Sequence, residues 1–233
     1  MYAVTGTLID VDCTKGNARK EQIPEDMYRK YLGGYGLGAA FLMDRIDPAC
    51  DPLGPESLVG FATGYLTGTG AYIASRFMTF GKSPSTGGWG DANCGGKFGI
   101  TMKQAGVDAI LFSGISEEPI YLVIEDGEAR VEKANWLWGK DCYETEELLL
   151  GKYGKDAEVA CIGPAGENLS AIAGVSTDKG RFAARSGLGA VFGSKRVKAV
   201  VVKGNQAIEL ADKEKMKTLR KEHMEDFKNP FGE

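Results

Sequence analysis

Apolar and polar residues alternate along several short stretches of this chain, which is the pattern of half-buried β-strands. Residues 4–12 alternate in this way and predict a strand, which a turn at 14–17 joins to a second strand near 18–23. Asp126-Gly127 is a dipeptide preferred in type I′ hairpin turns. The other predicted strands are 58–63, 73–80, 109–113, 120–125, 128–133, 157–162, 171–176 and 199–203.

Helix signals occur between these strands. Pro24 is expected as the first residue of a helix that ends at Gly33-Gly34, because proline suits the first helical position. Asp141 with Glu144 resembles a capping box ahead of an apolar run. The pattern of apolar and charged residues over 212–227 predicts an amphipathic helix, which is expected to end at Asn229-Pro230. We also expect a helix over 38–45, loops over 48–56 and 81–96, and a sharp turn over 163–166.

A glycine-rich segment occurs twice, 90 residues apart. Gly95-Gly96-Lys97-Phe98-Gly99 and Arg185-Ser186-Gly187-Leu188-Gly189 align without a gap, and each leads to a strand. Each copy predicts a glycine loop, a short helix and a β-branched strand. Such a loop places backbone N–H groups at a helix N-terminus, where phosphates bind. The repeat therefore predicts two related half-sites, with a chance match of short glycine runs as the alternative.

The order of elements indicates the fold class. Many strands, several in hairpins and with helices between them, predict an α+β fold rather than a doubly wound parallel sheet. The glycine runs do not follow the Gly-x-Gly-x-x-Gly pattern with a later acidic residue, so a Rossmann site is not expected. A Walker A segment is not found either.

Composition narrows the class of protein. The 233 residues suit one large domain or two small ones, and 33 glycines are about twice the usual share of roughly 7%. A net charge of −4 argues against a nucleic-acid partner. Apolar runs fall short of the ~20 residues of a membrane span, and the first residues do not resemble a secretory signal. We expect a cytoplasmic protein.

Cysteine and histidine usage excludes several chemistries. The five cysteines are widely separated and form no CxxC pair, which disfavours zinc, iron–sulfur and disulfide frameworks. The single histidine, His223, lies in a charged tail, so a Ser-His-Asp or Cys-His triad is not expected.

Three segments could hold a ligand. Arg76 lies in an alternating run with Met78 and Phe80, where it is either an anion clamp or a solvated edge arginine. The segment 91–96 is either a ligand loop or a plain turn, and its Cys94 has no role that the residues alone suggest. Arg181 and Arg185 are four residues apart and would face one way on a helical turn, with a solvated basic pair as the alternative.

The chain resembles the N-terminal domain of the tungsten-containing aldehyde ferredoxin oxidoreductases from Gly6 to about Gly204. The matching motifs are Tyr31-Leu32-Gly33-Gly34-Tyr35-Gly36-Leu37-Gly38, Ala62-Thr63-Gly64-Tyr65-Leu66-Thr67-Gly68-Thr69, Lys82-Ser83-Pro84, Asp91-Ala92-Asn93-Cys94-Gly95-Gly96, Ala105-Gly106-Val107-Asp108-Ala109-Ile110, Ile162-Gly163-Pro164-Ala165-Gly166-Glu167-Asn168 and Gly189-Ala190-Val191-Phe192-Gly193-Ser194-Lys195. The resemblance implies two β-sheets related by an internal pseudo-two-fold duplication, with flanking helices in a layered αββα-like sandwich. It also implies that residues 1–208 seat a bis-pterin tungsten (or molybdenum) cofactor and that 209–233 begin a linker helix.

The resemblance also assigns cofactor-binding residues. In the first half these are Arg76, Asn93, Cys94 and Gly95. In the second half they are Arg181, Phe182, Ala184 and Arg185. The backbone carbonyls of Asn93 and Phe182 would hold a magnesium ion between two pterin phosphates. Phe182, Ala184 and Ser186 stand where the family tends to have smaller residues, so the path of the second loop is open.

Family members carry a [4Fe–4S] cluster in downstream domains, and this chain has no such cysteine cluster. The resemblance therefore implies either a fragment or truncated form, or a partner subunit that supplies the missing half. The complete enzyme would oxidise aldehydes to carboxylates and pass electrons to ferredoxin, this chain alone would be inactive, and a homodimer is one arrangement. The alternative is a stand-alone pterin-binding or assembly module without catalysis.

Overall fold

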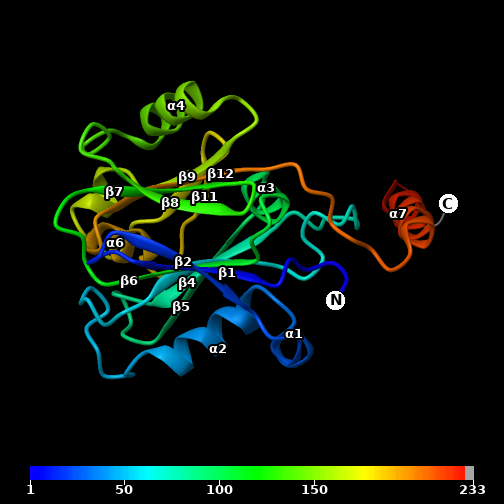
Figure 1. Ribbon diagram of the computed structural model, residues 1–233, viewed down its shortest axis with the longest axis horizontal. Helices are drawn as coiled ribbons and strands as arrows, with labels where there is room; N and C mark the ends of the chain where they lie inside the picture. Colours follow the sequence, from blue (N-terminus) through cyan, green and yellow to red (C-terminus); the bar gives the residue numbers. More distant parts are fainter. Residues whose placement is uncertain (229–233) are drawn as a thin grey trace.

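The computed structural model describes residues 1–228, which form two six-stranded mixed β-sheets (Figure 1). The strands of the first sheet are β1 (Thr7–Asp12), β2 (Asn17–Gln22), β3 (Val59–Thr63), β4 (Phe77–Lys82), β5 (Trp89–Cys94) and β6 (Ala109–Ser113). Those of the second are β7 (Ile120–Glu125), β8 (Glu128–Lys133), β9 (Glu158–Cys161), β10 (Val175–Thr177), β11 (Arg181–Ala183) and β12 (Val197–Lys203).

The two sheets have the same topology. The first runs in the order β2-β1-β6-β3-β4-β5, and the second in the order β8-β7-β12-β9-β10-β11. The β1/β6 and β7/β12 pairs are parallel, and the other neighbours are antiparallel. The repeated glycines Gly99 and Gly189 are each the second residue of a short helix, α3 (Phe98–Gln104) or α6 (Leu188–Ser194). The predicted α+β class and internal duplication are thus confirmed.

Helices form three layers, one on the outer face of each sheet and one between the sheets (Figure 1). The outer face of the first sheet packs against α1 (Glu25–Tyr31) and α2 (Tyr35–Arg45), and that of the second packs against α4 (Cys142–Tyr153). Side chains of α3 and α6 fill the space between the sheets, and α5 (Pro164–Glu167) packs on α6. The predicted αββα arrangement is confirmed.

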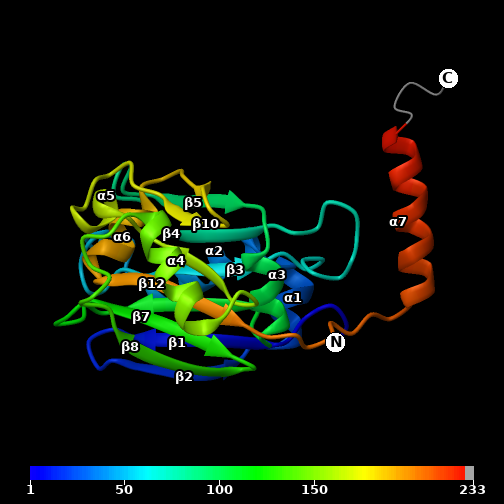
Figure 2. The same cartoon turned by 90° about the horizontal axis from the view of Figure 1, so that it is seen from above.

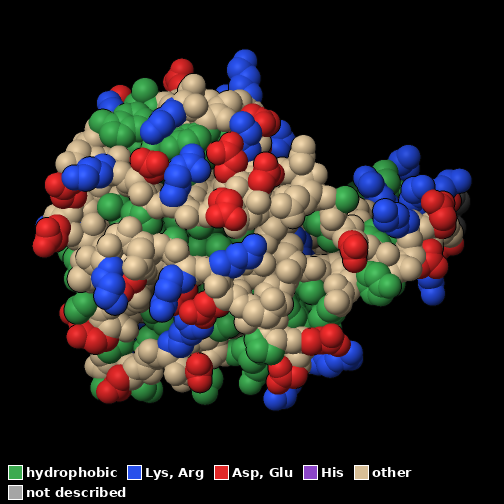
Figure 3. Space-filling view, in the orientation of Figure 1, with side chains coloured by type: hydrophobic (Ala, Val, Ile, Leu, Met, Phe, Trp, Pro, Cys, Tyr) green, Lys and Arg blue, Asp and Glu red, His purple; other side chains and the backbone are tan. Residues whose placement is uncertain are grey.

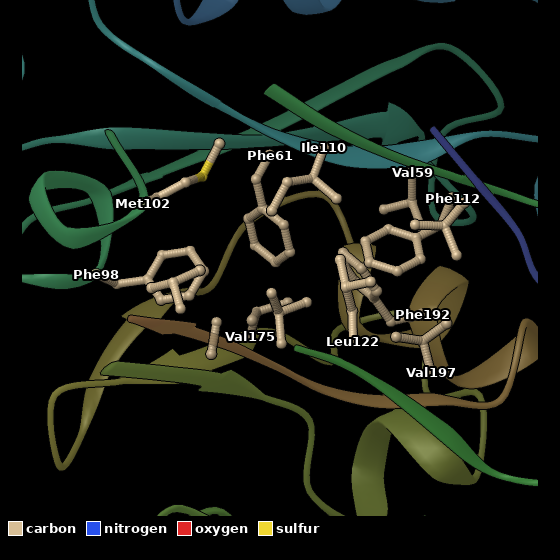
Figure 4. Close-up of a cluster of buried hydrophobic side chains, with 14 of the residues drawn as sticks. Val59, Phe61, Phe98, Met102, Ile110, Phe112, Leu122, Val175, Phe192 and Val197 are labelled. Carbon is tan, nitrogen blue, oxygen red and sulfur yellow. The ribbon is translucent and has the colours of Figure 1, made fainter. Parts of the chain in front are cut away.

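A single hydrophobic core joins the two halves (Figure 4). Phe61 of the first sheet stacks on Phe192 of α6, with ring centroids 5.1 Å apart, and also contacts Phe98 of α3 at 5.4 Å. These aromatic side chains are almost fully buried. Burial of a side chain of this size stabilises the fold by about 1.5–3 kcal/mol. The core therefore belongs to both repeats rather than to either one.

Buried charges occupy equivalent positions of the two repeats, but their signs differ. Asp108 precedes β6 and accepts hydrogen bonds from the Thr5 N–H at 2.7 Å and the Tyr28 hydroxyl at 2.7 Å. Lys198, 90 residues later, forms an ion pair with Glu167 instead. Both charges are paired, as burial requires.

Several elements differ from the sequence predictions. The segment 81–96, predicted as a loop, contains β5, because its backbone pairs with β4 along the whole of that strand. The strand predicted over 73–80 begins only at Phe77, as β4. The strand predicted over 171–176 is the shorter β10, which begins at Val175. The turn predicted at 163–166 is the short helix α5. Pro24 is the residue before α1 rather than its first residue.

The helix predicted over 212–227 is α7 (Lys213–Lys228), which stands apart from the sheets (Figure 2). It contains no buried residue, and charged side chains of both signs cover it (Figure 3). Phe227 contacts Tyr72 of the body, with ring centroids 5.8 Å apart. Just before α7, the Glu209 carbonyl accepts a hydrogen bond from the Ala3 N–H at 2.7 Å. The stop predicted at Asn229-Pro230 and the rest of residues 229–233 lie outside the described residues.

Candidate functional site

The candidate site lies where the last strands of the two sheets, β5 and β11, meet. Ser186, which follows β11, joins the two halves there. Its hydroxyl donates to the Asp91 carbonyl at 3.0 Å and accepts from the Asp91 N–H at 3.1 Å. The Ser83 hydroxyl donates to the Ser186 carbonyl at 2.9 Å. These bonds connect residues about 100 positions apart and fix one edge strand against the other.

Two arginines, one from each half, converge on Gly95. A Cβ atom built on Gly95 would lie 3.4 Å from Nη1 of Arg76 and 3.8 Å from Nη1 of Arg181. Arg76 precedes β4 and Arg181 begins β11, and both side chains are exposed. Two guanidinium groups beside a residue without a side chain concentrate positive charge at Gly95, which suits an anion.

Asn93 faces the same site with its backbone. In an antiparallel pair, the N–H and C=O of one residue point to one side and those of the next residue to the other. Both groups of Asp91 bond Ser186, so they point away from β4, and Asn93 two residues later has the same orientation. Its exposed side chain donates to the Tyr35 hydroxyl at 2.8 Å.

Cys94 lies next to these residues, but its side chain is buried. Burial raises the pKa of the thiol, and the nearby Asp178 carboxylate raises it further, although Arg181 and Arg76 act in the opposite direction. A protonated, 4%-exposed thiol belongs to the core. Only the backbone of Cys94 is placed to border a ligand.

One N–H group at the N-terminus of α3 is already bound by the protein. Asp178, in the turn between β10 and β11, accepts the Lys97 N–H at 3.1 Å and 3.0 Å with its two oxygens. At the N-terminus of α6, the Gly189 N–H donates to the Ala173 carbonyl at 2.9 Å. The first residues of the two helices, Phe98 and Leu188, are core residues.

The second loop also differs from its sequence prediction. Arg181 lies in β11 and not on a helical turn, so the expected shared helical face with Arg185 is wrong. The strand is formed because residues 181–183 pair with β10. Its Ala183 is buried, Phe182 is 46% exposed, and Ala184 and Arg185 are exposed beyond it. Within residues 1–228, the Arg185 guanidinium has no ion-pair partner.

A cleft of 840 Å³ adjoins the site on the side of α4. Asp178, Glu146 and Glu158 line it together with Lys97 and Lys179. Burial raises the pKa of Glu158 to about 7, and the nearby Asp178 carboxylate adds to the shift. Burial also raises the pKa of Glu146, whose carboxylate accepts the Lys179 N–H at 3.0 Å.

The described part of the chain offers few other functional sites. In residues 1–228, no group of three or more His, Cys, Asp or Glu side chains is placed to hold a metal ion. Over the same residues, no helix combines the length and the apolar character of a membrane span.

Arg76, Asn93, Gly95 and Arg181 were predicted as site residues from the sequence, and the fold brings them together. Asp178 and Tyr35 were given no role at that point. A weak signal existed for Asp178. Aspartate tolerates the left-handed backbone better than most residues, and Asp178 precedes Lys179-Gly180 in a tight turn. For Tyr35, no local pattern indicates a bond made across 58 positions.

Comparisons with known proteins agree on one family. Residues 8–204 match the family described as "Aldehyde ferredoxin oxidoreductase, N-terminal domain". A tungsten-containing aldehyde ferredoxin oxidoreductase of Pyrococcus abyssi (strain GE5 / Orsay) is 42% identical over 98% of this chain and 38% of its own length. The protein of the same name from Pyrococcus horikoshii is also 42% identical, over 97% of this chain and 37% of its own length. The chain thus spans less than two fifths of these relatives.

A solved structure has the same fold. The active site complex BamBC of benzoyl coenzyme A reductase, in complex with 1,5-dienoyl-CoA, contains a chain that superposes with a TM-score of 0.95. Its sequence is 37% identical, and the match covers 98% of this chain and 35% of that one.

Proposed function

Because the chain belongs to the aldehyde ferredoxin oxidoreductase family, of which it represents the N-terminal domain, we propose that it seats a tungsten (or molybdenum) bis-pterin cofactor. The proposed seat is the junction of β5 and β11. The cofactor would rest there on the first half through residues 76 and 93–95, and on the second half through residues 181–185.

The observation that carries this proposal is the convergence of Arg76 and Arg181 on Gly95. A pterin cofactor of this class ends in phosphate groups, and guanidinium groups bind phosphate with paired, charge-assisted hydrogen bonds. The space that a Cβ would fill at Gly95 lies within 4 Å of both guanidinium groups. The donor set therefore fits an anion held between the two halves.

Magnesium is proposed to bind the backbone carbonyl oxygens of Asn93 and Phe182. Such a hard cation takes oxygen ligands and keeps several waters, so two carbonyls suffice for a bridging site. Asn93 and Phe182 lie in the two edge strands that meet at the site, and the carbonyl of Asn93 points away from its own sheet. The side chain of Phe182 does not enter this argument, because a carbonyl ligand is independent of residue type.

The remaining residues of the predicted set would border the bound cofactor. The exposed Ala184 and Arg185 border the second loop, where Arg185 adds positive charge. The backbone of Cys94 lies between Asn93 and Gly95. Exposed aromatic side chains near the first half, Tyr35 and Trp89, would exclude water from the cofactor's edge.

When bound, the cofactor would supply the two-electron chemistry by which a complete enzyme oxidises an aldehyde to its carboxylate, with a [4Fe–4S] cluster and ferredoxin accepting the electrons. The iron–sulfur part, and the partner domains or subunit that carry it, are proposed from the relatives' greater length. We likewise propose the boundary after residue 208 and a cytoplasmic location. The aldehyde is proposed from the family and not from the fold, which a chain of a benzoyl coenzyme A reductase complex also has.

Replacing either arginine tests the proposal. Arg76→Ala and Arg181→Ala, each made in the intact protein, are expected to lower tungsten and pterin content per chain by about tenfold or more, since each removes charge-assisted bonds to phosphate. Urea unfolding should be unchanged, because both side chains are exposed. The control is Arg29→Ala on α1, an arginine that is also exposed and lies away from the site. Full tungsten content in both site variants would contradict the proposal.

A further inference from the structure

The turn that carries Asp178 has an unusual backbone. It connects Thr177 of β10 to Arg181 of β11, which face each other across the hairpin. Asp178, Lys179 and Gly180 have φ angles of 48°, 53° and 111°. Two consecutive non-glycine residues in the left-handed region persist only where surrounding contacts hold them. Such contacts are present on both sides of this turn.

On one side, the turn is bound to its own half. The Lys179 N–H donates to both carboxylate oxygens of Glu146 on α4, at 3.2 Å and 3.0 Å. On the other side, Asp178 crosses to the first half and accepts the Lys97 N–H with both oxygens. The turn is therefore a bridge, fixed to α4 at one residue and to α3 at the residue before it.

Gly96 makes the crossing possible. A Cβ at Gly96 would lie 2.2 Å from Oδ2 of Asp178 and 2.9 Å from Cδ of Arg181. The Asp178 carboxylate and the aliphatic part of Arg181 thus pack against the same glycine. One residue earlier, at Gly95, the end of the Arg181 side chain meets that of Arg76.

We propose that Asp178 is a positioning residue of the cofactor site, which acts by fixing Arg181 of the second half over Gly95 of the first. This inference rests on the proposed function, because Arg181 is the residue that would bind the phosphate. Asp178 itself does not contact the ligand. Its carboxylate accepts the N–H of Lys97, the N-cap residue of α3, and so keeps that N–H from binding the ligand.

The charge of Asp178 opposes its proposed role, and this conflict makes the role testable. A carboxylate close to an anion site weakens anion binding by repulsion. If Asp178 had no positioning role, its removal would leave phosphate affinity unchanged or increase it. If it fixes Arg181, its removal decreases the affinity in spite of the lost repulsion.

The experiment measures binding of inorganic pyrophosphate to the intact chain by calorimetry. Asp178→Ala and Asp178→Gly are expected to weaken binding at least tenfold. The glycine variant relieves the left-handed backbone, so weak binding by that variant reflects the lost carboxylate and not strain. Asp178→Asn keeps an acceptor for the Lys97 N–H and tolerates positive φ, so it should bind within threefold of the unaltered chain or more tightly. Unchanged or tighter binding by the alanine and glycine variants would overturn the proposal.

A second readout separates this inference from the proposed function. If the unaltered chain binds no pyrophosphate, or if Arg76→Ala and Arg181→Ala leave its affinity unchanged, the proposed anion site is wrong. The role of Asp178 is then judged by NMR of the Arg181 side chain. Its Nε–H should be ordered in the unaltered chain and in Asp178→Asn, and mobile in Asp178→Gly. An equally ordered Arg181 in Asp178→Gly would reject positioning by Asp178.

Discussion

Cys142 differs from the other thiols of the chain in its surroundings. It is the first residue of α4 and is half-buried, and its backbone carbonyl accepts a hydrogen bond from the Cys161 thiol at 3.6 Å. The adjacent Cys161 thiol, with the nearby Lys198 ammonium, lowers the pKa of the Cys142 thiol. The donor, Cys161, is 1% exposed, and its pKa is raised well above the ordinary value. One thiol of the pair is thus activated and the other is not.

We expect Cys142 to react with iodoacetamide about tenfold or more faster than the buried Cys13 at pH 7.5, because the thiolate is the nucleophile. Burial raises the pKa of Cys13 to about 12. Peptide mapping by mass spectrometry after brief alkylation measures both rates. Cys161→Ala should slow the reaction of Cys142, whereas Cys161→Ser, which keeps a donor, should not. Equal rates in these two variants would show that the donor group at position 161 has no such effect.

Single residues could be named from the sequence where a motif includes them. The glycine and arginine motifs identified Arg76, Gly95 and Arg181, which the fold brings together. Asp178 was not identified, because its partner, the Lys97 N–H, lies 81 positions away. A side-chain bond to a backbone group at that separation leaves no local trace in one sequence.

Among the secondary-structure elements, α5 and α6 are packed with their backbones in direct contact. A Cβ at Gly193 of α6 would lie 1.9 Å from the Gly166 carbonyl oxygen of α5, and one at Gly166 would lie 2.8 Å from the Gly189 carbonyl oxygen. Glycine is required on both helices because no side chain fits between them.

Two glycine-to-alanine changes in helices should therefore have opposite effects. Gly193→Ala is expected to destabilise the chain by about 3 kcal/mol or more, since the backbone of α5 must move. The control, Gly151→Ala on α4, adds a methyl group that meets nothing within 4 Å. It should stabilise the chain by about 0.5–1 kcal/mol through helix propensity. Urea unfolding gives both values, and a loss of stability in both variants, or in neither, would contradict this account.

Elements were predictable where their own residues favour them. The hairpin at Asp126-Gly127 formed as expected, with positive φ at both residues, and Asp141 caps α4 by accepting the Glu144 N–H. The strand β5 was missed because Gly90, Asp91 and Asn93 all disfavour strands. Pairing with β4 overrides these preferences, and that pairing is a tertiary contact.

The two repeats share the core that lies between their sheets. Phe61 of the first repeat and Phe192 of the second are in contact, and residues of both sheets surround them. Removing either repeat would leave the inner face of the other exposed to water. The two halves should therefore unfold together.

Tryptophan fluorescence can test this cooperativity, because Trp89 lies in the first half and Trp136 and Trp138 lie in the second. Trp89→Phe leaves reporters in the second half only, and the double variant Trp136→Phe/Trp138→Phe leaves one in the first. Urea midpoints reported by the remaining tryptophans should match the midpoint from circular dichroism in each variant. Two separated transitions within one variant would indicate that the halves are independent units.

At this scale, the repeat spacing was the most informative sequence feature. The 90-residue offset between Gly99 and Gly189 predicted the duplication that the two strand orders confirm. The direction in which the halves meet was not predictable. Ser186 joins the halves at the edge strands, and Asp178 joins them at the N-terminus of α3, both through bonds between residues more than 80 positions apart.

The bond between Ala3 and Glu209 has a consequence for the order of the repeats along the chain. Since these two positions are neighbours, a short peptide could join them, and the chain could be opened instead between β6 and β7. Every strand pairing within each sheet would survive that circular permutation, because none of them uses the connection between β6 and β7. A gene encoding the second repeat before the first would then specify the same two sheets.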